Sequence, residues 1–171
     1  TRLSGFQDLH RLQDEKNIQG AFGLWHYAEE VFSLITGMDQ FTLQPAAGAH
    51  GELTGLFIIK AALEDKGETD RDTILIPDSA HGTNPASAAL AGFKVQKVPS
   101  SPEGIIEPET LKTYLGSNIA GMMLTNPNTL GLFERNILTI TKMIHEIGGE
   151  VYYDGANLNA ILGWARPGDM G

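Results

Sequence analysis

The strongest constraint on the fold is a regular alternation of short apolar runs with helical segments in the second half of the chain. Apolar runs occupy residues 73–76, 94–98, 120–124 and 150–153, and helical segments are predicted at 85–91, 108–115 and 134–147. Short apolar strands that alternate with helices form a parallel sheet covered by helices on both faces. The sequence therefore predicts an α/β fold with a mainly parallel sheet.

The first third of the chain has a different pattern. Apolar residues at steps of three and four predict a helix from 14 to 36, which Gly37 would end. A short strand at 41–43, a turn-rich stretch at 44–51 and a helix at 52–66 follow. We therefore predict an N-terminal segment with a helix at 1–40 and a larger domain at 41–171.

Composition excludes several classes of function. The chain has 171 residues, no Cys, and 21 acidic against 12 basic side chains, for a net charge of −9. Without Cys it has no disulfides, thiolate zinc sites or thiol nucleophiles. Its acidity argues against binding to nucleic acid or to an anionic membrane surface. Since the first residue is Thr1 and the last ones suggest no natural stop, we expect a piece of a longer protein.

Polar residues follow three of the predicted strands directly, at 78–84, 125–129 and 154–157. Ligands of open parallel sheets bind beyond the carboxyl ends of the strands, and right-handed crossovers bring these ends to one rim. The same residue types also cap helices and form turns, so each segment alone has a plain structural explanation.

The small residues at 45–51 precede a helix, where backbone N–H groups and the helix dipole can receive a phosphate. A tight turn explains this stretch equally well. His50 and His81, together with Glu52 and Asp78, would suit a metal ion by residue type. Their spacing matches no regular ligand motif, so we predict no metal site.

Four segments in order resemble one known family: QPAAGAHGELTG at 44–55, DSAHGTNPAS at 78–87, LTNPNTLG at 124–131 and YYDGANLNA at 152–160. They resemble glycine decarboxylase, the P-protein of the glycine cleavage system. This is a pyridoxal-phosphate enzyme of fold type I, either subunit 2 of a split enzyme or the C-terminal half of a single chain. The resemblance covers essentially all of the sequence.

The resemblance implies roles for individual residues. His81 would stack on the pyridine ring and assist proton transfer, and Asp154 would pair with the pyridinium nitrogen. These two are the implied catalytic residues, and both also bind the cofactor. The other implied cofactor-binding residues are Ala47, Gly48 and Ala49 at the phosphate, Asn126 and Asn157 near the ring oxygen, and Thr83.

The reaction implied by the resemblance is decarboxylation of glycine, with transfer of the aminomethyl group to the lipoyl arm of H-protein. The implied partners are glycine, lipoylated H-protein and the other P-protein subunit or half, in an oligomer without nucleic acid or membrane. The implied location is the cytoplasm of a bacterium or the mitochondrial matrix of a eukaryote.

One departure from the family concerns the lysine that anchors the cofactor. The family carries it in a His-Lys-Thr-type segment that would follow Gly171, and no lysine of this chain follows Asp154. The resemblance therefore implies part of a large domain, without its last strands, that is inactive by itself. The family order 3-2-4-5-6-7-1 would leave the strand at 41–43 without a partner and the strand at 150–153 at an open edge.

Two alternatives stay open. One is another fold-type I enzyme, similar to a cysteine desulfurase or an amino-acid decarboxylase. The other is a non-catalytic binding or assembly module that does not need the lysine.

Overall fold

A computed structural model describes residues 4–10 and 12–171. Internal contacts divide the chain into two compact units, residues 1–44 and 45–171. The sequence predicts a boundary between residues 40 and 41, close to this division, and the assignment of domains stays a prediction.

The first unit is built around one long helix. A short 3-10 helix η1 (Glu15–Asn17) precedes α1 (Gln19–Thr36), which ends at Gly37 with a left-handed φ of 72°. Glycine adopts this conformation without a Cβ clash, so the predicted helix end is confirmed.

The predicted strand at 41–43 is wrong. These residues have no regular secondary structure, and the ring of Phe41 lies 5.6 Å from the ring of Phe32 in the same unit. A strand exists only when a neighbouring strand takes up its backbone hydrogen bonds. No described segment pairs with this one.

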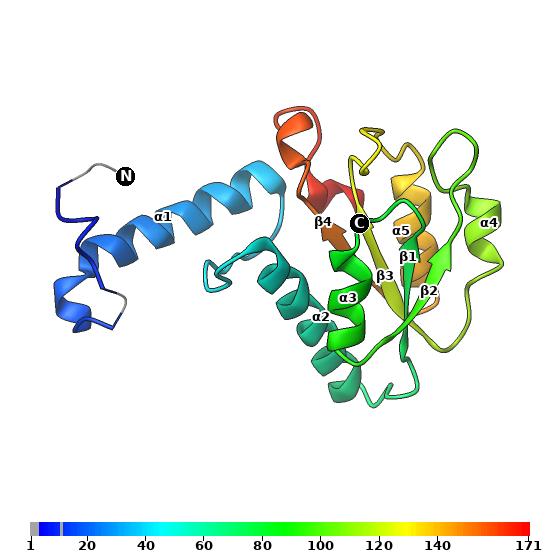
Figure 1. Ribbon diagram of the computed structural model, residues 1–171, viewed down its shortest axis with the longest axis horizontal. Helices are drawn as coiled ribbons and strands as arrows, with labels where there is room; N and C mark the ends of the chain where they lie inside the picture. The colour runs from blue at the N-terminus through cyan, green and yellow to red at the C-terminus, as the bar shows by residue number, and fades with distance from the viewer. Residues whose placement is uncertain (1–3, 11) are drawn as a thin grey trace. The chain divides into compact units, whose positions relative to one another are not determined.

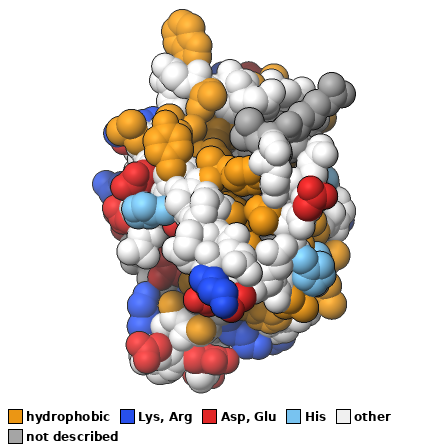
Figure 2. Space-filling view, turned by 90° about the vertical axis from the view of Figure 1, so that its left-hand side faces the viewer, with side chains coloured by type: hydrophobic (Ala, Val, Ile, Leu, Met, Phe, Trp, Pro, Cys, Tyr) orange, Lys and Arg blue, Asp and Glu red, His pale blue; other side chains and the backbone are white. Residues whose placement is uncertain are grey.

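Large apolar side chains are exposed along α1, including Leu24, Trp25, Tyr27 and Leu34. Hydrophobic side chains are among those exposed on the face that Figure 2 shows. Neither α1 nor any other helix among the described residues combines the length and hydropathy needed to cross a membrane.

The second unit contains a four-stranded parallel sheet (Figure 1). Its strands are β1 (Thr73–Pro77), β2 (Lys94–Val98), β3 (Ile119–Thr125) and β4 (Glu150–Asp154), in the order β2-β1-β3-β4. This order confirms the prediction for these strands and leaves β4 at one edge. The register pairs Thr125 with Asp154, which brings the carboxyl ends of β3 and β4 together.

Helices cover both faces of the sheet, as predicted (Figure 1). On one face α2 (Gly48–Asp65) and α3 (Thr83–Leu90) cover a core that includes Ile74 and Ile76. On the other face α4 (Pro108–Lys112) and α5 (Ile137–Glu146) cover a core that includes Leu75. Alternate residues of the buried strand β1 thus point to opposite faces.

Several helix ends differ from the prediction. Helix α2 begins at Gly48 rather than near residue 52, because the N–H of Gly51 already donates to the carbonyl of Ala47. Helix α5 begins at Ile137 rather than 134, because its first helical hydrogen bond runs from the N–H of Ile140 to the carbonyl of Asn136. Helix α4 ends early, and the 3-10 helices η2 (Leu158–Ala160) and η3 (Pro167–Met170) were not expected.

Candidate functional site

Asp154 ends strand β4 and is the centre of a hydrogen-bonded cluster at the rim of the sheet. Its Oδ2 accepts from Nε2 of His81 at 2.8 Å and from Nδ2 of Asn84 at 3.0 Å, and its Oδ1 accepts from the N–H of Ala156 at 3.0 Å. Burial by itself would raise the pKa of Asp154, but the hydrogen bonds from Asn84 and His81 outweigh it and lower the pKa below 3.8. The carboxylate is therefore ionised at neutral pH.

His81 lies on the loop between β1 and α3, and its neighbours determine where its proton is. The backbone N–H of Thr83 donates to Nδ1 at 3.3 Å, so the proton of the neutral ring is on Nε2 and points to Asp154. The amide of Asn84, 3.2 Å from the same Nε2, accordingly donates to Asp154 instead. The imidazole is thus a donor held in one orientation, with 34% of its side chain exposed.

Two buried residues that sequence reasoning did not assign to the site support this pair. Asn84 is fully buried, and its Oδ1 accepts from the hydroxyl of Thr125 at 3.4 Å, which connects α3 to the end of β3. Glu52, on the second turn of α2, accepts from the hydroxyl of Ser87 at 3.0 Å. Both residues fall inside the four family-like segments, and for Glu52 a second signal is its acidic type beside His50, already noted for a metal ion.

Glu52 also faces the imidazole, since its Oε1 lies 3.8 Å from Nε2 of His81. The possible ligand atoms of Glu52, His81 and Asp154 all lie within 4.8 Å of one another, so these residues would suit a divalent cation by type. The Nε2–H of His81 is directed at Asp154 in a hydrogen bond, and the expectation of no metal site stays a prediction.

The N-terminus of α2 carries the predicted phosphate cradle. Ala47, Gly48 and Ala49 are exposed, no side chain caps the helix, and its first turn has no acidic residue. A Cβ added at Gly48 would meet no atom within 4 Å, so the space beside this turn is open. An uncapped helix N-terminus attracts anions through its free N–H groups and its dipole.

The two predicted asparagines are bound within the loops. The Oδ1 of Asn126 accepts from the N–H of Glu134 at 2.9 Å, and the residue is fully buried beside a cis peptide bond to Pro127. The amide of Asn157 donates to the carbonyl of Pro127 at 2.9 Å. The side chain of Asn126 thus closes the loop after β3, whereas that of Asn157 joins the loops after β3 and β4. Contact of either residue with a cofactor stays a prediction. Thr83, whose N–H binds His81, begins α3 beside the cluster.

Two tyrosines on β4 precede Asp154 and point to opposite faces of the sheet. Burial, followed by the charges of Asp154 and Glu52, raises the pKa of Tyr152 to about 12. Burial and the charge of Asp154 likewise raise the pKa of Tyr153 to about 12. Both phenols therefore stay protonated, and the hydroxyl of Tyr153 donates to the carbonyl of Asn126.

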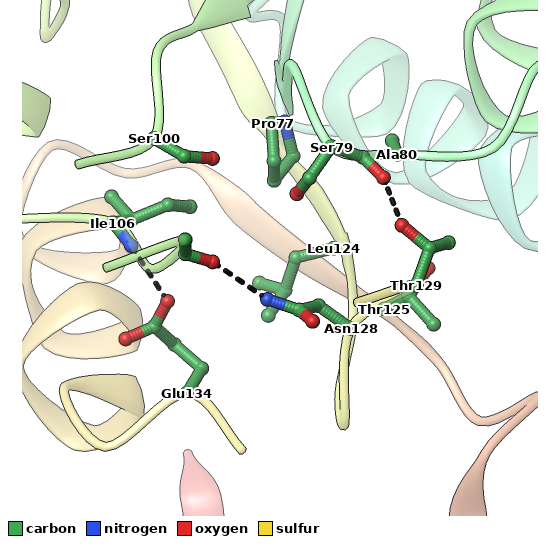
Figure 3. A pocket seen from close by; sticks show the side chains of 11 residues that line it. Pro77, Ser79, Ala80, Ser100, Ile106, Leu124, Thr125, Asn128, Thr129 and Glu134 are labelled. Atoms are coloured by element: carbon green, nitrogen blue, oxygen red, sulfur yellow. Dashed lines mark hydrogen bonds between the residues drawn. The ribbon is translucent and has the colours of Figure 1, made fainter. Parts of the chain in front are cut away.

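A separate pocket lies at the same rim between the ends of β1 and β3 (Figure 3). Its polar groups bind one another: Asn128 donates to the carbonyl of Gly104 at 2.8 Å, Glu134 accepts from Ile106 at 2.8 Å, and Thr129 donates to the carbonyl of Ser79. The space of about 10 Å³ holds no more than a water molecule. The residues that are predicted to bind the cofactor lie outside this pocket.

Comparison with known proteins identifies close relatives. No family model matches the chain. A probable glycine dehydrogenase (decarboxylating) subunit 2 of Caldanaerobacter subterraneus subsp. tengcongensis is 59% identical over 169 residues, which are 99% of this chain and 35% of the relative. The chain thus spans about a third of the length of such relatives. The family resemblance inferred from the four segments is confirmed.

Solved structures share the fold. A glycine decarboxylase (P-protein) of the glycine cleavage system, in inhibitor-bound form, matches with a TM-score of 0.70 at 18% identity over 86% of this chain and 32% of that one. A sphingosine-1-phosphate lyase of Burkholderia pseudomallei matches with a TM-score of 0.69 at 16% identity over 82% of this chain and 35% of that one. The predicted fold class, part of the fold-type I large domain, is confirmed.

Proposed function

We propose that the protein carrying this chain decarboxylates glycine and transfers the aminomethyl group to the lipoyl arm of H-protein. The chain would supply one part of the pyridoxal-phosphate site. Two near-equal TM-scores with different enzymes, 0.70 and 0.69, mean that the fold does not discriminate between activities. The choice of glycine therefore rests on the 59% identical relative and its name.

The residues at the rim fit the chemical parts of pyridoxal phosphate. An ionised carboxylate at Asp154 suits a protonated ring nitrogen, the partly exposed imidazole of His81 suits the face of an aromatic ring, and the uncapped N-terminus of α2 suits a phosphate. The ionised carboxylate of Asp154, held by three N–H donors, is the observation that carries the pyridoxal-phosphate part of the proposal.

Each of these residues has a defined task. Asp154 would keep a proton on the ring nitrogen, because its lowered pKa leaves the carboxylate charged at neutral pH. His81 would orient the ring and assist proton transfer. The backbone N–H groups at Gly48 and Ala49 would bind the phosphate. When bound, the cofactor supplies the electron sink for the carbanion that loss of carbon dioxide leaves.

The partners follow from the same proposal. The name "subunit 2" of the relative supports a second P-protein subunit as partner. Lipoylated H-protein and glycine come with the reaction, and the cofactor-anchoring lysine would come from outside these 171 residues. The bacterial source of the relative supports a cytoplasmic location.

The proposal is tested by exchange of labelled bicarbonate into glycine, catalysed by the full-length protein with its other subunit and lipoylated H-protein. Asp154→Asn removes the charge that holds the ring proton, so we expect the exchange rate to fall about a hundredfold. The matched control is Asp78→Asn, since Asp78 follows the end of β1 but is exposed, and its hydrogen bonds within the described part of the chain go to Ser100 and the Val98 carbonyl. This control should keep most of the activity.

Other outcomes would favour the alternatives. Cofactor binding without bicarbonate exchange would indicate another fold-type I enzyme, such as a cysteine desulfurase or amino-acid decarboxylase. A full-length protein that binds no cofactor would indicate a non-catalytic module. Equal losses in Asp154→Asn and Asp78→Asn would contradict the role of Asp154.

A further inference from the structure

Glu52 is a buried carboxylate that the proposed mechanism leaves unused. The residue is 6% exposed, and its Oε2 is held by the hydroxyl of Ser87, which is itself 3% exposed. Among the described residues no hydrogen bond is made to its Oε1, which faces Nε2 of His81 at 3.8 Å. This oxygen has lone pairs free to accept a hydrogen bond.

The hydrogen bonds of His81 have a second arrangement when a ligand binds to Asp154. Of the two side chains that donate to its Oδ2, Asn84 is fully buried, whereas the side chain of His81 is 34% exposed. A ligand that reaches this oxygen from solvent therefore displaces the imidazole rather than the amide. The Nε2–H of His81 then needs another acceptor.

Glu52 is placed to be that acceptor. A movement of about 1 Å brings Nε2 of His81 within hydrogen-bond distance of Oε1. The bond from Ser87 holds the carboxylate so that Oε1 stays directed at the imidazole.

We infer that Glu52 is the second acceptor for His81: the Nε2–H binds Asp154 in the free protein and Glu52 once a ring nitrogen occupies Asp154. Glu52 is thus a positioning residue that acts through His81. This inference rests on the proposed function, because it requires a ligand with a basic ring nitrogen at Asp154.

The test follows the Nε2–H of His81 by ¹⁵N-edited NMR in the full-length protein, without and with pyridoxal phosphate. The variants are Glu52→Leu, which removes the acceptor, and Glu52→Gln, which keeps a neutral one. Glu64→Leu is the matched control, since Glu64 is exposed on the same helix. The His81→Gln spectrum assigns the signal.

We expect the signal in every free protein that keeps His81, because Asp154 still accepts the proton there. With the cofactor bound, Glu52→Leu should lose it through exchange with water, Glu52→Gln should keep part of it, and Glu64→Leu should keep it fully. The kcat of bicarbonate exchange should fall about tenfold in Glu52→Leu with KM unchanged. Ser87→Ala, which leaves the carboxylate in place but unanchored, should weaken the signal in the loaded protein alone.

The outcomes separate this inference from the proposed function. A loaded Glu52→Leu protein that keeps the signal overturns the inference alone, as does loss of the signal in both free and loaded protein, which would indicate a structural role. If the wild type shows no circular-dichroism band from bound cofactor, the proposed function fails and this inference fails with it.

Discussion

Substitution of Gly55 tests the close packing that holds Asp154 in place. Gly55 lies on α2 where the helix crosses β4, and a Cβ added there would stand 2.4 Å from Cε2 and 2.8 Å from Cδ2 of Tyr152. Both distances are far below van der Waals contact. The Tyr152 ring is rigid and packs into the core between α2, α3 and the sheet, so it has little room to move.

The expected size of the effect comes from two opposing contributions. Gly55→Ala stabilises the helix by about 0.5–1 kcal/mol, because alanine loses less backbone entropy on folding. Forcing an extra carbon into a packed core costs about 1–3 kcal/mol. We therefore expect the free energy of unfolding to fall by about 1–2 kcal/mol.

Gly51→Ala is the matched control, one turn earlier on the same helix, where an added Cβ meets no atom within 4 Å. It should raise the free energy of unfolding by about 0.5–1 kcal/mol. Urea unfolding followed by far-ultraviolet circular dichroism measures both. If the two variants gain stability equally, α2 does not approach β4 as closely as described, and the reasoning fails.

Two further predictions concern pH. Burial would raise the pKa of Asp154, but the hydrogen bonds from Asn84 and His81 outweigh it, so the pKa in the folded protein lies below 3.8. The ionised carboxylate therefore stabilises the fold above pH 3.8, and this stabilisation is lost as the pH falls through the pKa of the folded protein. The urea midpoint of Asp154→Asn should fall less steeply below pH 3.8 than that of the wild type, and equal slopes would be contrary to this. Burial raises the pKa of Tyr152 and Tyr153 from 10.0 to about 12, so stability is retained up to pH 10.0 and lost as pH rises towards about 12. Spectrophotometric titration should show two phenols that ionise near pH 12. One of them should disappear in Tyr152→Phe and the other in Tyr153→Phe. Ionisation of these two side chains near pH 10.0 would refute the assignment.

The sheet and the position of Asp154 could be predicted from the sequence. The apolar runs before Asp78 and Asp154 identify buried strands, and parallel strands place their carboxyl ends on one edge. The structure pairs Thr125 with Asp154 and brings His81 to the same point. Strand order followed from the family resemblance, since a local pattern does not say which strands are neighbours.

Other features were outside the reach of sequence patterns. The stretch at 41–43 has strand-like residues but no partner, and pairing is a property of two segments rather than one. Asn126 follows a strand as a site residue would, and its amide oxygen accepts from the Glu134 N–H, while its role toward a cofactor stays a prediction. Nothing in a local sequence specifies which backbone group reaches a given amide.

The amino-acid sequence by itself determined the alternation of strands and helices, the acidic charge, and the segments that carry the family's chemistry. These depend on residue type and on spacing along the chain. Only the tertiary structure decided that Glu52 is buried against His81, that Asn84 and His81 share one oxygen of Asp154, and that Gly55 lets α2 approach β4. Such contacts join residues that are distant in sequence, and their geometry arises only when the helices pack on the sheet.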